Sequence, residues 1–380
     1  MDFELSEQDL ELKQMARDLA TKRIAPIAME MDENGETPQE LIRECAELGY
    51  FGFIVPEEYG GLGMSTTAFM GALEEICAAS AGFGIMLSVH NSLTCDILKL
   101  FACEPLKKKY LPKMAAGELI GSYCITEPNA GTDVAALSTV AVEKGDHYLL
   151  SGTKSFVTSA IYAGVYIVFA KTHPEEGRNG ISCFVVERGS KGLTLGKAEQ
   201  KCGIKASDTR EISLADVVVP KENMIGSDRD GFRMAVTILN GGRIGVSFQA
   251  IGIARAAMEE AIKYAKTRKQ FGQAIANFQA IQFKLAEMGT KLDAARLLGY
   301  RAAWLKDNGK PCHREASMSK LFCSQAANYI CNEAVQIHGG YGYIKEYPVE
   351  RYFRDARVTE LYEGTTEAQK MVISRDILRD

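Results

Sequence analysis

A continuous apolar stripe between residues 281 and 305 constrains the fold of this chain more strongly than any other feature. Its members recur at spacings of three and four, the pattern of one face of an amphipathic α-helix about seven turns long: Ile281, Leu285, Met288, Leu292, Ala295, Leu298, Ala302 and Leu305. Asn308-Gly309 ends this helix, and a second long helix is predicted from Arg314 to about His338, where Gly339-Gly340 stops it. The C-terminal part of the chain is therefore expected to be helical.

Helical patterns also dominate the first 120 residues, and strand patterns follow them. Helices are predicted after a Ser6 cap with an interruption at Pro26, after Pro38, from Thr66 to about Ser80 and from Ser92 to Phe101. From about Gly121, short runs rich in Val, Ile, Phe and Thr predict antiparallel strands at Ser151 to Thr158, Val165 to Lys171, Ile181 to Glu187 and Glu211 to Val219. A connector is expected from Gly226 to Gly231.

These patterns predict an α+β fold class in three parts. An N-terminal helical domain is expected over residues 1–120, a middle β-barrel or β-sandwich domain over 121–230 and a C-terminal helical domain over 231–380. A chain of 380 residues is long enough for two or three such domains.

Composition and charge exclude several classes of function. The net charge is -5, with Lys and Arg scattered among Asp and Glu, so no nucleic-acid partner is expected. No run of eighteen apolar residues occurs, so no membrane span is predicted. The acidic, amphipathic N-terminal segment resembles neither a secretory signal nor a transit peptide. Ten cysteines are dispersed without a C-x-x-C pair, which predicts reduced thiols and a cytoplasmic location.

The motifs of several enzyme classes are missing from the sequence. There is no Walker loop, no G-x-G-x-x-G after a strand, no H-E-x-x-H and no G-x-S-x-G. The five histidines are dispersed, so no metal site and no Ser-His pair is predicted, and His147, His173 and His313 are expected to be structural.

Five short polar segments containing Gly or Thr remain, each at the end of a predicted element. They are Tyr123 to Asp133, Lys154 to Thr158, Arg268 to Gly272, Gln336 to Gly340 and Leu361 to Glu367. Each segment alone is also ordinary turn chemistry. Taken together and in this order, they resemble the acyl-CoA dehydrogenase family, with T-E-P-x-A-G-[ST]-D, R-x-x-F-G, Q-I-x-G-G-x-G and Y-E-G-T all present. The resemblance extends from about Leu5 to Leu378 and is closest to short-chain (butyryl-type) and short branched-chain members.

The resemblance implies FAD, held between the middle β domain and a C-terminal four-helix bundle. By motif matching, the residues that border the cofactor are Tyr123, Ile125, Thr126, Gly131, Thr132, Phe156, Thr158, Arg268, Phe271, Gln279, Gln336, Gly339, Gly340, Thr365 and Glu367. Phe156 departs from the family, where many relatives have Trp, but it keeps an aromatic face for stacking. The alternative is a core strand residue for Phe156 and a solvated helix end for Arg268. Arg268, Gln279 and the Gln336 to Gly340 loop match positions that contact the FAD of a neighbouring subunit in relatives, which implies a homotetramer.

The resemblance also implies a mechanism, in which Glu363 is the base. It removes the α-proton of an acyl thioester while the β-hydrogen leaves as hydride to flavin N5, with the thioester oxygen held by an oxyanion-hole arrangement. Glu367 borders the cofactor and is not expected to be a second base. The residues expected to contact substrate are Thr132, Asn240, Arg243 and Gly364.

The segment Leu239 to Arg243 matches the start of the family's substrate-facing helix. Arg243 is there expected to be an orienting charge, or otherwise a surface Arg at a helix start. Gly241 and Gly242 place little side-chain volume near the acyl site, so a branched or alicyclic chain is expected to fit as well as a short straight one.

The remaining expectations concern the far end of the pocket and the overall reaction. His90 could line the pocket or serve packing, and Asn91 offers no second carboxylate. The predicted activity is α,β-dehydrogenation of an acyl-CoA, with electron-transferring flavoprotein as the acceptor. The alternatives are an acyl-CoA oxidase that uses oxygen, a family member acting on a cyclic or dicarboxylic acyl-CoA, and a non-catalytic scaffold that has kept the fold.

Overall fold

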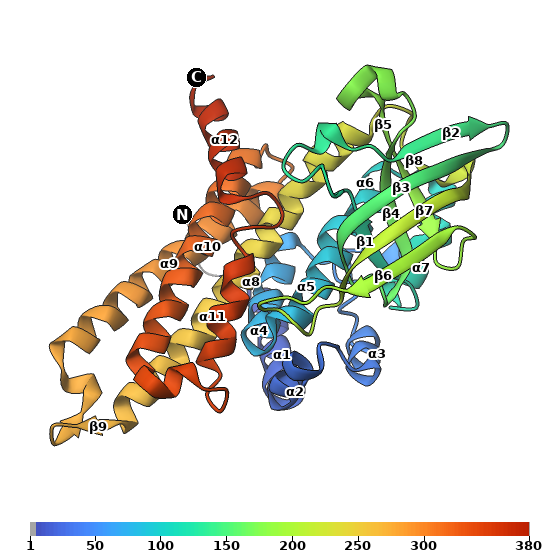
Figure 1. Ribbon diagram of the computed structural model, residues 1–380. Helices are drawn as coiled ribbons and strands as arrows, with labels where there is room; N and C mark the ends of the chain where they lie inside the picture. The colour runs from blue at the N-terminus through green and yellow to red at the C-terminus, as the bar shows by residue number, and fades with distance from the viewer. Residues whose placement is uncertain (1–4, 380) are drawn as a thin grey trace.

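The computed structural model describes residues 5–379 and divides them between a helical body and a β-sheet at one end (Figure 1). The N-terminal helices are α1 (Glu7–Leu19), α2 (Ala28–Asn34), α3 (Gln39–Glu47), α4 (Thr66–Ala79), α5 (Ala81–Val89), α6 (Asp96–Phe101) and α7 (Glu104–Ala115). The C-terminal helices are α8 (Gly231–Thr267), α9 (Gln279–Asp307), α10 (His313–His338), α11 (Val349–Val358) and α12 (Thr366–Ile377). The predicted order of helix, sheet and helix is confirmed.

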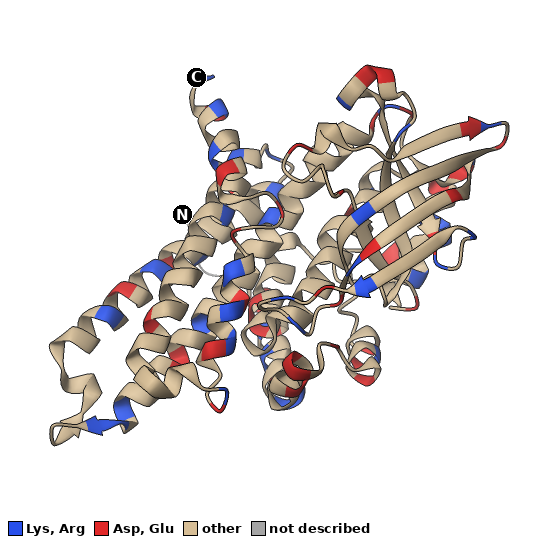
Figure 2. Ribbon diagram, in the orientation of Figure 1, with Lys and Arg blue, Asp and Glu red and all other residues tan. Residues whose placement is uncertain are grey.

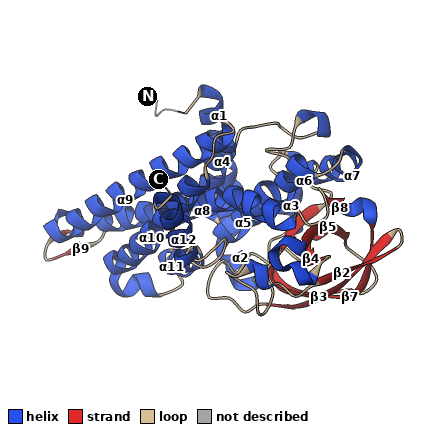
Figure 3. Ribbon diagram, turned by 90° about the horizontal axis from the view of Figure 1, so that it is seen from above, coloured by secondary structure: helices blue, strands red, loops and turns tan. Residues whose placement is uncertain are grey.

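The strands lie between these two sets of helices in the sequence. They are β1 (Ile120–Cys124), β2 (Val140–Lys144), β3 (His147–Thr158), β4 (Ala163–Lys171), β5 (Ile181–Glu187), β6 (Leu193–Ala198), β7 (Thr209–Pro220) and β8 (Met224–Ile225), with a separate short hairpin of β9 (Lys269–Gln270) and β10 (Gln273–Ala274) between α8 and α9. Figure 3 shows the main sheet set apart from the helical bundle.

The main sheet is mixed, which corrects the prediction of antiparallel strands. In the described part of the chain it has eight strands in the order β6-β7-β3-β2-β4-β5-β8, and β1 pairs with β4. The β1–β4 pairing is parallel over Ile120 to Cys124, and β2 also makes a parallel contact with β4. The sequence signal missed β1 because it follows helix α7 directly and is almost entirely buried, so it has no alternation of polar and apolar residues.

The N-terminal helices begin at residues whose side chains cap them. Ser6, Ser65 and Ser80 accept hydrogen bonds from the backbone N–H groups three residues later. The Ser80 cap ends one helix and begins α5, which is buried on every side and therefore lacks the periodicity that predicts a helix. The helix predicted from Ser92 to Phe101 in fact begins at Ala81 and passes through a π-helical turn, His90–Cys95, before α6.

The long apolar stripe lies on α9, as predicted. Its members are buried or half-buried against α8 and α10, and Asn308 follows the last helical residue. Helix α8 crosses the molecule, because it begins beside Ile181 of β5 and ends at the β9–β10 hairpin (Figure 1). This helix connects the sheet with the far end of the bundle.

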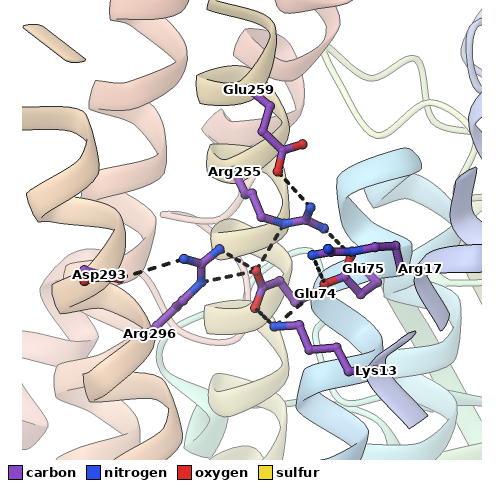
Figure 4. Close-up of polar contacts among 8 residues, drawn as sticks. All are labelled: Lys13, Arg17, Glu74, Glu75, Arg255, Glu259, Asp293 and Arg296. Atoms are coloured by element: carbon purple, nitrogen blue, oxygen red, sulfur yellow. Dashed lines mark hydrogen bonds and ion pairs between the residues drawn. The ribbon is translucent and has the colours of Figure 1, made fainter. Parts of the chain in front are cut away.

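A network of buried ion pairs joins α1, α4, α8 and α9 (Figure 4). Glu74 contacts Lys13, Arg255 and Arg296 at 2.8–3.2 Å, and Glu75 contacts Arg17 and Arg255 at 2.6–3.0 Å. Both carboxylates are almost fully buried. Burial alone would raise the pKa of Glu74, but the surrounding cations lower it. The network therefore holds the N-terminal helix against the bundle.

The surface outside this network carries mixed charge (Figure 2). Lys and Arg are interspersed with Asp and Glu along the helices, as the sequence predicted. Among the described residues, no helix combines the length and the apolar character needed to cross a bilayer. All ten cysteines are free thiols, eight of them buried.

Replacing Glu74 by Gln tests the ion-pair network. The variant keeps the side-chain volume but leaves Lys13, Arg255 and Arg296 facing a neutral amide, which should cost about 3 kcal/mol of stability. We expect the melting temperature, measured by differential scanning fluorimetry, to fall by several degrees. Asp18→Asn, which removes an exposed pair between the end of α1 and Lys22 one turn later, is the control and should change nothing measurable. Equal melting temperatures for the two variants would contradict this account.

Candidate active site

Glu363 lies in the short loop between α11 and α12, in a conformation that side chains rarely adopt. Its φ is +53°, and that of Gly364 is +90°. The preceding Tyr362 anchors the loop, because its hydroxyl donates to Gln249 Oε1 on α8. Gln249 in turn donates to the carbonyl of Ala81 at 3.0 Å. The backbone turn at Glu363 is thus held by contacts to two other helices.

The carboxylate of Glu363 points into the protein. Its Oε2 atom is buried and has no hydrogen-bond partner among residues 5–379. The backbone of Gly242 lies directly against it, since a Cβ on Gly242 would come within 2.5 Å of Oε2. Burial raises the pKa of Glu363 to about 7, although the charges of Arg243 and Lys320 pull it down. Such a carboxylate is poised to exchange a proton near neutral pH.

Arg243 is buried in the middle of α8, which corrects the expectation that Leu239 to Arg243 begins a helix. Its guanidinium donates to Asn240 Oδ1 at 3.2 Å and to Ser317 Oγ of α10 at 3.3 Å. The alternative of a surface Arg is therefore wrong. Asn240 lies beside Arg243 and orients it.

The two glycines before Arg243 make room for protein atoms. Gly242 makes room for the Glu363 carboxylate and for Leu93, whose Cδ2 would lie 2.9 Å from an added Cβ. Gly241 lets α8 approach the backbone of the π-helical turn, since an added Cβ would lie 2.9 Å from the carbonyl oxygen of Ser92. The open volume expected at these glycines is therefore already occupied.

Two residues that were not predicted from the sequence donate hydrogen bonds to backbone carbonyls of this loop. Lys320 of α10 donates to the carbonyl of Gly364 at 2.7 Å. Gln369 of α12 donates to the same carbonyl at 2.8 Å and to that of Glu363 at 3.1 Å. Lys320 interrupts a run of small buried residues on α10, and that signal could have identified it.

Thr365 and Glu367 begin α12. The Thr365 hydroxyl accepts from the backbone N–H of Ala368 at 3.3 Å, so it is the N-cap of this helix. Glu367 is exposed in the first turn. Among the described residues, neither side chain makes a hydrogen bond or an ion pair with the Glu363 carboxylate.

The segment from Tyr123 lies near Glu363 and continues into an exposed loop. The Tyr123 hydroxyl is buried without a hydrogen-bond partner among residues 5–379, and burial together with the nearby Glu363 charge raises its pKa. Ile125 is buried and Thr126 half-buried, while Gly131 and Thr132 are exposed.

This loop is bonded to the end of β3. The Ser155 N–H donates to the carbonyl of Thr126 at 2.9 Å, and the Ser122 hydroxyl donates to that of Thr158 at 2.7 Å. The β3–β7 register shifts between Lys154 and Val157, and Phe156 has a φ of +55°. As a result Phe156 turns outward with 66% of its surface exposed, so the alternative of a core strand residue is wrong.

A buried ion pair that the sequence analysis did not assign shapes the same loop. Lys154 is fully buried and contacts Glu127 Oε1 at 2.7 Å. Glu127 also accepts hydrogen bonds from the backbone N–H groups and hydroxyls of Ser138 and Thr139. Burial opposes its ionisation, but Lys154 and these donors lower the pKa of Glu127 to about 2. The loop therefore closes around a charged, fully bonded carboxylate.

A third group of predicted residues surrounds an open pocket at the far end of α8. The pocket has a volume of about 440 Å³ and includes Arg268, Gly339 and Gly340 in its lining. The Arg268 guanidinium lies over the Tyr341 ring at 5.5 Å. Gln279 and Gln336 are exposed, and Phe271 has 93% of its surface exposed at the tip of the β9–β10 hairpin.

The structure does not bring this third group together with Glu363. Arg243 lies within α8 and Arg268 directly follows its last residue, so 25 positions separate them. At about 1.5 Å per residue this separation is about 37 Å. The predicted residues therefore form two separate sites within one copy of the chain.

His90 serves packing. Its Nε2 lies 3.2 Å from the carbonyl oxygen of Met114, and its Nδ1 accepts from the backbone N–H of Gly121 at 3.0 Å. Burial lowers its pKa to about 4, so the ring is neutral and both nitrogens are occupied. The three histidines predicted to be structural, His147, His173 and His313, contact Asp146, Asp228 and Asp376.

Comparison with known proteins places this geometry in a family. Models of the N-terminal, middle and C-terminal domains of acyl-CoA dehydrogenase match residues 6–118, 122–217 and 229–378. A short-chain-specific acyl-CoA dehydrogenase of Clostridium acetobutylicum is 45% identical over 379 residues, with both chains fully covered. The chain belongs to the acyl-CoA dehydrogenase family.

Two further matches agree with this assignment. The butyryl-CoA dehydrogenase of Megasphaera elsdenii superimposes with a TM-score of 0.98 at 43% identity, over all of both chains. The CarC subunit of the caffeyl-CoA reductase–Etf complex of Acetobacterium woodii is 46% identical, covering 98% of this chain and 99% of that subunit. The predicted family, fold class and FAD-dependent acyl-CoA dehydrogenation are confirmed, and the oxidase and scaffold alternatives are not favoured.

Gly242→Ala tests the contact between α8 and the Glu363 carboxylate. An added Cβ cannot be accommodated 2.5 Å from Oε2, so the carboxylate must move and acyl-CoA dehydrogenase activity should fall. A displacement of about 1 Å typically costs about 100-fold in kcat/KM. Steady-state kinetics measures this loss, with circular dichroism to verify folding. Gly71→Ala, also within a helix but only in ordinary contact with Tyr300, is the control. Unchanged activity in Gly242→Ala would contradict the contact.

Proposed function

We propose that Glu363 removes the α-proton of a short-chain acyl-CoA thioester during FAD-dependent dehydrogenation. The observation that carries this proposal is the buried, unpaired Oε2 of Glu363 on a loop held in a left-handed turn. A structural carboxylate in such a place would be hydrogen-bonded, because an unpaired buried charge is costly. A carboxylate that receives a proton from a substrate must instead have a free oxygen.

The electrostatics of the loop suit this role. With a pKa of about 7, a substantial share of Glu363 is deprotonated at neutral pH, yet it remains basic enough to accept a proton. Glu363 must be deprotonated to act, so activity rises as the pH rises through this pKa. Substrate binding excludes further water and should raise the pKa again.

The backbone of the loop offers a donor for the thioester oxygen. Among the described residues, the N–H of Glu363 donates to no acceptor, whereas the N–H groups of Leu361, Tyr362 and Thr366 do. A free N–H beside the base is suited to stabilise the negative charge that develops on the thioester oxygen. Arg243 adds a buried positive charge to the same site.

The residues on the sheet side fit a flavin. Phe156 is an aromatic side chain turned outward by a strained backbone, which suits stacking on a planar ring. The Tyr123 hydroxyl is buried and unpaired among the described residues, and an added Cβ on Gly131 would meet no atom within 4 Å. These features supply a stacking face, a donor and open space beside the backbone.

The residues that would hold FAD are therefore those predicted from the sequence. From one copy they are Tyr123, Ile125, Thr126, Gly131, Thr132, Phe156, Thr158, Thr365 and Glu367, and from a second copy Arg268, Phe271, Gln279, Gln336, Gly339 and Gly340. When bound, FAD supplies the hydride acceptor. Thr132, Asn240, Arg243 and Gly364 would contact or orient the substrate.

The distance between the two sets supports an oligomer. One copy separates them by about 37 Å along α8, so a complete FAD site needs two copies. Phe271 and Tyr343, at the far end of the bundle, have 93% and 86% of their surfaces exposed, which suits contact with another copy. We infer a homotetramer built from such pairs.

The electron acceptor and the location are inferred from a relative and from the free thiols. The relative from Acetobacterium woodii belongs to a complex with Etf, and we infer that an electron-transferring flavoprotein also serves this chain. The free thiols agree with a reducing compartment, and we infer the cytoplasm. We also infer domain boundaries near residues 120 and 230, where the family models change.

The acyl chain is expected to be short and straight. Gly241 and Gly242 do not enlarge the site for a branch or ring, because Ser92, Leu93 and Glu363 fill the space directly beside them. We expect kcat/KM for butyryl-CoA to exceed that for isobutyryl-CoA and cyclohexanecarbonyl-CoA by about tenfold or more. Competition kinetics with mixed substrates measures this ratio. Equal use of all three thioesters would contradict this expectation and restore the broader substrate range predicted from the sequence.

Anaerobic titration with butyryl-CoA tests the proposed base. The flavin absorbance of the wild-type protein should bleach, and kcat/KM should rise with pH with an apparent pKa of about 7. Glu363→Gln should bind the ligand but reduce flavin about 1,000-fold more slowly, since general-base catalysis contributes that much. Glu222→Gln, an exposed carboxylate on the sheet side, is the control and should behave as wild type. Full-speed reduction by Glu363→Gln would remove Glu363 from this role.

A further inference from the structure

Lys320 is a fully buried lysine in the middle of α10. Its ammonium donates to the carbonyl of Gly364 at 2.7 Å, directly after Glu363 in the sequence. Burial lowers its pKa to about 8, although the charges of Glu363, Glu360 and Glu367 raise it and that of Arg243 lowers it. Burying the charge of a lysine costs free energy, so fully buried lysines are rare unless they are paired.

The hydrogen bond to Gly364 alone does not require a lysine. Gln369 already donates to the same carbonyl at 2.8 Å, so the oxygen would keep a partner without Lys320. A neutral side chain at position 320 could therefore satisfy the packing of this loop. The positive charge of Lys320 needs a separate explanation.

Gly364, which accepts this hydrogen bond, directly follows the charged residue Glu363 in the sequence. The Lys320 and Arg243 charges both lower the pKa of the Glu363 carboxyl against the effect of burial. Tyr123 and Tyr362 also face the carboxylate, but burial and the Glu363 charge raise their pKa values, so both are neutral. Lys320 and Arg243, on two different helices, are thus the cations that favour the ionised form of Glu363 against the effect of burial.

The same contact fixes the direction of the loop. Glu363 has a positive φ, which a residue with a side chain would leave in a free loop. Lys320 and Gln369 hold the carbonyls of this turn on the side of α10 and α12. Because each peptide is planar and trans, the following N–H groups point to the opposite side.

We propose that Lys320 is a positioning residue for Glu363, holding the carbonyl of Gly364 and placing a buried positive charge beside the base. This inference rests on the proposed function of Glu363 and extends it to α10. It assigns to Lys320 both the geometry of the turn and the protonation state of the carboxylate at neutral pH.

Two neutral variants test the proposal. Lys320→Met removes the charge and the donor, while Lys320→Gln removes the charge and keeps a donor. We expect both to shift the pH profile of anaerobic flavin reduction by butyryl-CoA upward by about one to two pH units, because the carboxyl loses a neighbouring cation. At high pH, where Glu363 is ionised in every variant, Lys320→Met should still be about tenfold slower than wild type, and Lys320→Gln should be faster than Lys320→Met.

Lys284→Met is the matched control. Lys284 contacts Glu333, which lies on the same helix α10 but 13 residues beyond Lys320, or about 20 Å away. Its loss should change the melting temperature without moving the pH profile. A residue with a merely structural role would behave in the same way.

The outcomes separate this proposal from that for Glu363. If the wild-type flavin is not bleached by any acyl-CoA, the proposed function fails. If wild type is bleached and both Lys320 variants keep the wild-type pH profile, only the role of Lys320 is overturned. If neither neutral variant folds with flavin bound, Lys320 serves stability alone and the proposal is likewise overturned.

Discussion

The approach of the Glu363 carboxylate to the backbone of α8 is the contact on which the active site depends. A carboxylate oxygen can lie against a helix backbone only where the residue has no side chain, and Gly242 provides that position. Burial at this contact would leave the carboxyl protonated and inert, but Arg243 of the same helix and Lys320 of α10 partly offset it. The pKa of about 7 is therefore a balance between burial and two charges, and each helix that carries one of them must be placed accurately.

The need to place these helices accurately gives a reason for the buried ion pairs that join α8 to the rest of the bundle. Helix α8 carries Gly242, Arg243 and Gln249, so its position sets the carboxylate, a cation and the anchor of Tyr362 at once. The same helix also carries Arg255, which lies farther along it and pairs with Glu74 and Glu75 of the buried network. Charged networks of this kind fix geometry more than they add stability, since the cost of burying the ions offsets much of their attraction. The main effect of the Glu74 and Glu75 network is therefore to fix the position of α8, more than to stabilise the fold.

The sequence predicted the elements with strong periodicity and the residues within recognisable motifs. The α9 stripe, the α10 helix and the Glu363 loop were found because their patterns are local. The parallel β1–β4 pairing and helix α5 were missed, because both are buried on all sides and have no alternation to detect. Lys320, Gln369 and the Glu127–Lys154 pair were not assigned. The Lys154–Glu127 and Lys320–Gly364 contacts join residues 27 and 44 positions apart, and the role of Gln369 depends on a turn visible only in three dimensions. The meaning of Gly241 and Gly242 also needed the structure, which shows that their space is filled by protein.

The balance at Glu363 also bears on the direction of the reaction. A carboxyl with a pKa near neutrality exists in both protonation states, so the same group can take a proton from an α-carbon or return one to it. Relatives named as a dehydrogenase and as a reductase subunit are 45% and 46% identical to this chain, and both cover it almost completely. Nothing in the position of Glu363 favours one direction, because a base in one direction is the acid in the other. The direction must then be set by the potential of the electron partner and by the supply of thioester, outside the pocket that holds this carboxylate.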